Sequence, residues 1–202
     1  MREIRRGALV AAMLGCVILA GCDSEPATQA EPESFDTLVA SAIDEAKAGG
    51  AGEAQLAILE RSQSEGEVSL EDARAATRAA VDCINAAGSS ATYEEATGKS
   101  GLIVPGHSSL ANTDEQLALA DKCDAQEYWW VFMVYTSQPT SQGLQDAYLE
   151  QQVPLVRSCL EKNGHAAPSD ATTIEVLRQA TDVKTESDGA VDCLAEAKIE
   201  GF

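Results

Sequence analysis

The sequence contains few basic residues, and this scarcity limits the partners that it can bind. It has 14 lysine and arginine residues against 33 aspartate and glutamate residues, a formal net charge of −19 at pH 7. A surface with this charge repels nucleic acid and anionic lipid headgroups and favours solubility. We therefore expect no nucleic-acid partner and interpret most of the acidic residues as solvated surface.

Several motifs that carry chemistry are also missing. There is no Cys-x-x-Cys pair, which argues against a thioredoxin-like enzyme and against a zinc ribbon. No Asp-x-Asp-x-Asp-Gly loop occurs, so an EF-hand calcium site is unsupported. The Gly-x-Ser-x-Gly turn of a serine hydrolase is absent as well. We therefore predict no cofactor, no metal site and no catalytic residue that the sequence alone can identify.

The first 21 residues are typical of a secretory signal peptide. Three arginines form a basic segment, and residues 9–19 are apolar and uncharged. This apolar run has the length of a signal-peptide core and is too short to span a bilayer comfortably. It ends in the motif Leu19-Ala20-Gly21-Cys22.

This motif resembles the lipobox of bacterial lipoproteins, in which a branched apolar residue and two small residues precede a cysteine. The resemblance implies cleavage before Cys22 and attachment of palmitate-type acyl chains to this cysteine. One acyl chain binds a membrane only marginally, whereas two or three hold firmly. We therefore predict a lipid-anchored protein on the extracytoplasmic face of the cell membrane, with residues 1–21 as its signal peptide.

The rest of the chain divides into a tether and a domain. Residues 22–33 hold two prolines, four acidic residues and no large apolar residue, so we predict a disordered tether. From residue 34 the apolar residues recur with the period of a helix. The expected fold is therefore all-α, a compact disulfide-stapled helical domain over residues 34–202.

Apolar periodicity and capping residues predict the individual helices. We expect them at about 35–48, 52–63, 70–87, 113–135, 141–163, 171–181 and 188–198. Residues 88–112 are rich in Gly, Ser and Thr and contain GLIVPGHS, which fits a short strand or an ordered loop. Residues 128–135 have the propensity of a strand, but we predict a helix because they continue a helical pattern.

Four cysteines lie in the predicted domain. We expect them to form disulfide bonds because their number is even and because the predicted extracytoplasmic compartment is oxidising or at least exposed to the outside. Cys83 and Cys159 each precede a helix-ending glycine, and each is followed by a loop, a helix and another cysteine. This arrangement favours the pairs Cys83–Cys123 and Cys159–Cys193. The tetrapeptide AVDC ends at both Cys83 and Cys193, so the other two pairings stay open.

The layout resembles uncharacterised small envelope lipoproteins of high-GC Gram-positive bacteria. The resemblance covers most of residues 50–165 and implies a location but no chemistry. The residues that carry it are Gln55-x-x-Ile58-Leu59, Gly66-Glu67-Val68, Cys83 with Gly88, Cys123 with the aromatic residues downstream, and Cys159-Leu160 with Gly164.

An aromatic run in residues 128–135 is the best candidate for a binding site. A single helix cannot turn every one of these side chains inward, so one or two are expected to line a groove or a partner surface. Trp129, Trp130 and Tyr135 are the candidates for ligand binding. They indicate a binding or interaction module for an envelope protein, a peptide or a glycan.

An envelope hydrolase with an unrecognised active site is the alternative. His107 is followed by two serines, and His165 is the other histidine of the chain. Both follow a glycine in a predicted loop, which is typical of surface histidines. A cleft that gathered His107, acidic side chains and a serine at hydrogen-bond distance would favour the hydrolase.

Overall fold

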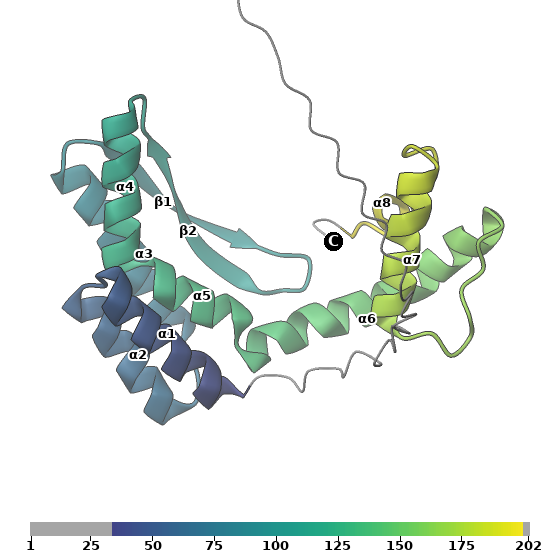
Figure 1. The fold of residues 1–202 in the computed structure, drawn as a ribbon, viewed down its shortest axis with the longest axis horizontal. Helices are drawn as coiled ribbons and strands as arrows, with labels where there is room; N and C mark the ends of the chain where they lie inside the picture. The colour runs from purple at the N-terminus through teal and green to yellow at the C-terminus, as the bar shows by residue number, and fades with distance from the viewer. Residues whose placement is uncertain (1–33, 200–202) are drawn as a thin grey trace, which may run out of the picture. The chain divides into compact units, whose positions relative to one another are not determined.

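The structure is a computed structural model that describes residues 34–199 (Figure 1). The predicted signal peptide (residues 1–21), the predicted anchor Cys22 and the predicted tether (residues 22–33) lie outside the described residues. The elements in chain order are α1 (Phe35–Gly49), α2 (Glu53–Glu65), α3 (Leu70–Ala86), β1 (Ser90–Thr97), β2 (Ile103–Leu110), α4 (Asp114–Glu127), α5 (Trp129–Ser137), α6 (Pro139–Lys162), α7 (Thr173–Glu186) and α8 (Cys193–Glu196).

The described part of the chain is mostly helical, and hydroxyl side chains begin several of the helices. The side chain of Ser34 accepts a hydrogen bond from the backbone of α1, and that of Ser69 does the same for α3. Thr172 and Glu175 form a complete capping box at the start of α7. These caps satisfy backbone N–H groups that have no partner within the helix.

A β-hairpin interrupts the helices, so the predicted all-α class is only approximate. Strands β1 and β2 pair antiparallel, from Ser90 opposite Leu110 to Thr97 opposite Ile103. Gly101 lies in the connecting turn with a φ of +83°, a conformation that favours glycine. The segment that we expected to be either a short strand or a loop therefore forms most of β2.

The predicted helix over residues 113–135 is divided into α4 and α5 at Tyr128. The Gln55 side chain of α2 is fully buried beside this break. Its amide nitrogen donates to the backbone oxygen of Ala125 at 3.0 Å, and its oxygen accepts from the backbone nitrogens of Trp130 and Val131 at 2.7 and 3.3 Å. Gln55 thus satisfies backbone groups that a helix break leaves without helical partners.

The end of the domain also departs from the prediction. α7 continues to Glu186, and the expected helix over residues 188–198 shortens to α8. Asp188 and Gly189 both have positive φ angles, of 51° and 78°, so the chain turns here and leaves the helical conformation. α6, in contrast, continues through Pro154.

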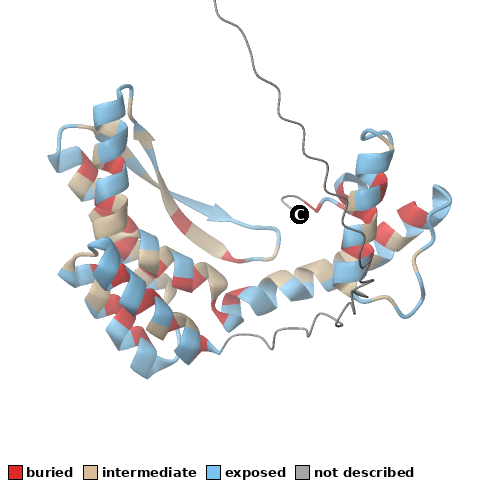
Figure 2. Ribbon diagram, in the orientation of Figure 1, coloured by how far each residue is buried: buried red, intermediate tan, exposed pale blue. Residues whose placement is uncertain are grey.

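The buried residues form two main apolar clusters (Figure 2). The first is built mainly from α1, α2, α3 and α5 with residues near the hairpin turn, and the second from α6, α7 and α8 with the residues that follow it. Disulfide Cys83–Cys123 joins α3 to α4, and disulfide Cys159–Cys193 joins α6 to α8. Of the three possible pairings, the structure has the sequential one. No helix within residues 34–199 is long and apolar enough to cross a membrane.

Candidate functional site

Helix α5 has an unusual composition, because none of its nine residues is charged. Val131 and Val134 point into the first apolar cluster and are almost fully buried. Trp129 and Met133 lie four residues apart and therefore share another face of the helix. They remain 44% and 39% exposed. The helix thus presents large apolar side chains both to the core and to the surface.

A groove runs between α5 and α1, and we call it the α1–α5 groove. Its volume is about 440 Å³. The α1 side is a stripe of residues at helical spacing, and the α5 side carries both tryptophans. The lining residues are Leu38, Ser41, Ala42 and Glu45 from α1, and Trp129, Trp130, Met133, Val134 and Ser137 from α5.

The three predicted aromatic residues have different environments. Trp129 is exposed at the groove, whereas Trp130 is partly buried and packs against the first apolar cluster. A Cβ atom added at Gly49 would lie 3.0 Å from the indole of Trp130, so this glycine allows the close approach of α1 and α5. Tyr135 is buried, and its hydroxyl donates to the backbone oxygen of Ile103 at 2.7 Å. The structure therefore places Trp129 and Trp130 at the groove and Tyr135 in the core.

The charge at the groove is negative. Glu45 is the one charged residue among those that line it. Its carboxylate accepts a hydrogen bond of 3.2 Å from the hydroxyl of Ser41. Lys47, two residues further along α1, forms an ion pair with Glu60 at 3.1 Å. The groove therefore combines an apolar floor with one exposed carboxylate.

A second pocket, of about 430 Å³, contains His107. This histidine belongs to β2, so the expectation that it lies in a surface loop is wrong, and its side chain is only 9% exposed. Nε2 of His107 lies 2.7 Å from Oδ1 of Asp124. A carboxylate can only accept, so Nε2 donates, and Nδ1 has no hydrogen-bond partner among the described residues. Burial raises the pKa of Asp124, more than His107 lowers it.

The described surroundings of His107 do not supply a serine nucleophile. Ser108 follows it in the strand, so the two side chains leave opposite faces of the hairpin. The Ser108 hydroxyl donates to Glu94 at 2.6 Å, away from the imidazole. The residues that line the pocket thus include His107 and three acidic residues, Glu94, Glu95 and Asp124, but no serine. His165, the other candidate, is exposed after the end of α6.

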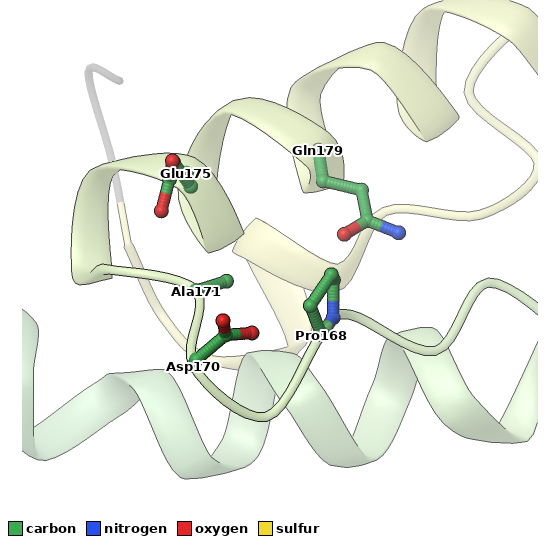
Figure 3. Close-up of a pocket in the computed structure, with 5 residues that line it drawn as sticks. All are labelled: Pro168, Asp170, Ala171, Glu175 and Gln179. Carbon is green, nitrogen blue, oxygen red and sulfur yellow. The ribbon is translucent and has the colours of Figure 1, made fainter.

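A third pocket, of about 330 Å³, lies at the start of α7 (Figure 3). Two of its polar side chains, Glu175 and Gln179, already have structural partners. Glu175 accepts the backbone N–H of Thr172 at 2.7 Å, and Gln179 donates to the backbone oxygen of His165 at 2.7 Å. These contacts cap the helix and fix the preceding loop. The lining residues are Pro168, Asp170, Ala171, Glu175 and Gln179.

The pockets contain no cluster suited to a metal ion. Within residues 34–199, no group of three or more His, Cys, Asp or Glu side chains is arranged to hold one. Comparison with protein-family models, with curated proteins and with solved structures found no match. The function of the α1–α5 groove is therefore inferred from its own geometry.

Sequence analysis did not identify the residues of α1 that line the groove. Leu38 belongs to the apolar face that predicted the first helix, but Ser41 and Glu45 resemble any other polar positions of a surface helix. Only the packing of α5 beside α1 gives them a common role. Among the exposed residues that line the groove, only Trp129 was a predicted candidate, because its side chain is a large aromatic ring.

Proposed function

We propose that this protein is a lipid-anchored binding protein on the extracytoplasmic face of the cell membrane, which contacts another envelope molecule through the α1–α5 groove. The observation that carries this proposal is the exposure of Trp129 and Met133 side by side on a helix without charge. Tryptophan is enriched among the residues that dominate binding energy at interfaces.

The cost of this exposure supports a role in binding. Burial of an aromatic side chain removes about 150–250 Å² of surface from water, so an exposed tryptophan retains a large part of that driving force. The neighbouring Met133 adds an unbranched and adaptable side chain of the kind found at binding surfaces. A partner that covers both residues would gain the free energy of burying the apolar surface that remains exposed after folding.

The proposed anchor is consistent with the domain. The lipobox places the first residue of the mature chain at Cys22, and α1 begins at Phe35. An extended tether of this length spans at most about 45 Å, so the groove would work close to the bilayer surface. The disulfide bonds Cys83–Cys123 and Cys159–Cys193 suit an oxidising compartment outside the cytoplasm.

The anchor is tested on the protein isolated from cells. Mass spectrometry should find an acylated Cys22 at the amino terminus, and Cys22→Ala should leave the membrane fraction. An intact initiator methionine, or an unmodified Cys22 in membrane-bound protein, would contradict the proposed anchor.

The binding role is tested by photo-crosslinking in cells. A photo-reactive amino acid at position 133 should give a discrete adduct with an envelope component. The matched control is position 144, because Leu144 is 44% exposed on α6 and lies outside the groove. If both positions gave the same adducts or none, the groove would not be a binding surface.

The alternative function is an envelope hydrolase, and the hydrogen bond between His107 and Asp124 is the observation that favours it. Such an enzyme would need a nucleophile beside the imidazole, and Ser108 is bonded to Glu94 instead. The hydrolase therefore has weaker support than the binding protein. It predicts that His107→Ala abolishes a hydrolytic activity while the fold remains intact.

A further inference from the structure

We propose that the occupant of the α1–α5 groove is a peptide segment of a partner protein that places an apolar side chain on the groove floor and a lysine or arginine beside Glu45 and Trp129. This inference rests on the proposed function and specifies the chemistry of its partner. Three features of the groove support it: its charge, the availability of its carboxylate and its apolar floor.

Charge complementarity selects a cationic partner. The nine residues that line the groove include one carboxylate and no basic side chain. The whole chain carries a net charge of −19, so an acidic partner would be repelled before it reached the groove. A basic segment would instead be attracted over a distance of about a Debye length.

The carboxylate of Glu45 is available to such a segment. Its hydrogen bond comes from the neutral hydroxyl of Ser41, and the nearby Lys47 is already paired with Glu60. The exposed indole of Trp129 lines the same groove, and tryptophan offers the best aromatic face for a cation. A lysine or arginine side chain could therefore contact both groups.

The groove floor favours a peptide over a glycan. Sugar recognition needs several polar groups that bond to hydroxyls, and here Glu45 is assisted only by Ser41 and Ser137. The remaining lining residues are apolar or aromatic, and the thioether of the exposed Met133 is only a weak acceptor for sugar hydroxyls. An amphipathic segment with aliphatic and basic side chains fits this combination.

The test measures the binding of a defined peptide by the full chain in nonionic detergent. The probe is a fluorescein-labelled 12-residue amphipathic peptide of leucine and lysine, followed by fluorescence anisotropy at 0.15 M salt. Glu45→Gln and Trp129→Ala should each weaken binding at least about fivefold, the effect of one charged or cation–π contact.

Two matched controls separate the groove from general electrostatics. Glu186→Gln removes the same charge at an exposed position of α7, and Leu144→Ala truncates an apolar side chain with the same exposure as Trp129. Each control should change the dissociation constant less than twofold. Circular dichroism checks the fold of every variant, and Met133→Ser replaces Trp129→Ala should the latter unfold.

Three results would overturn the proposal. Equal losses in Glu45→Gln and Glu186→Gln would reduce the binding to general charge attraction. Equally tight binding of a leucine–glutamate version of the peptide would remove the role of the cation. Binding of an N-acetylglucosamine oligomer that depends on Trp129, without binding of the peptide, would show a glycan site. In that last case the proposed binding function would stand, whereas a missing groove-specific adduct in cells would contradict the binding function itself.

Discussion

Replacement of Gln55 by alanine tests whether this side chain holds α5 in place. The side chain makes three hydrogen bonds to the backbone on both sides of Tyr128, and it is fully buried. Each bond contributes about 1 kcal/mol, and a backbone group left buried without a partner costs about 1–3 kcal/mol. We expect Gln55→Ala to lower the free energy of unfolding by about 3–5 kcal/mol.

Urea denaturation followed by tryptophan fluorescence measures this loss, because both tryptophans belong to α5. The matched control is Gln63→Ala, an exposed glutamine of the same helix, which should change the stability by less than about 0.5 kcal/mol. Similar values for the two variants would refute the assignment of Gln55 to the helix break. The variant should also lose groove-specific crosslinking from position 133, because the orientation of α5 positions the groove.

Three further predictions concern stability. Asp124→Asn keeps an oxygen that accepts from the imidazole but removes a half-buried charge, so it should raise the melting temperature at pH 7. Because burial raises the pKa of Asp124, this gain should shrink as the pH falls through that pKa; a constant gain would contradict the reasoning. Replacing Cys159 and Cys193 by serine opens a loop of 34 residues and should cost about 3–4 kcal/mol in urea denaturation; a loss below about 1 kcal/mol would argue against the bond. The ion pair with Arg74 lowers the pKa of Glu95 to about 2, so Glu95→Gln should be less stable than the wild type above pH 4.5. This difference should disappear in melting curves as the pH approaches 2, and its persistence there would contradict the role of the pair.

The helices were largely predictable because their signals are local. The apolar face of α1, the hydroxyl cap of α3 and the glycines after α1 and α2 all lie within the segments they define. The run 128–135 was also predictable as a helix despite its strand propensity, because it continues a helical pattern and no partner strand for it was evident.

The features that sequence analysis missed depend on residues far apart in the chain. The break at Tyr128 is stabilised by Gln55, more than 70 residues earlier, and nothing near Tyr128 announces it. The hairpin depends on the pairing of β1 with β2, and the sequence of the β2 segment alone fits either a short strand or a loop. Local sequence patterns therefore predicted the helices, whereas the break at Tyr128 and the hairpin depend on tertiary contacts.

The candidate site was predictable in part for the same reason. Helical geometry indicated that Trp129, Trp130 and Tyr135 could not all be buried, but it could not tell which would be exposed. That choice is made by α1 and the hairpin, which cover Trp130 and Tyr135 and leave Trp129 at the groove. The contribution of Glu45 became visible only once α1 and α5 were placed side by side.

The measurement that tests the central claim most directly is the comparison of crosslinked adducts from positions 133 and 144 of the membrane-bound protein in intact cells. If the α1–α5 groove is the binding surface, position 133 gives a discrete adduct that Glu45→Gln weakens, and position 144 gives none. Identical patterns from the two positions would contradict the account, because Met133 would then be no more occupied than any other exposed apolar side chain.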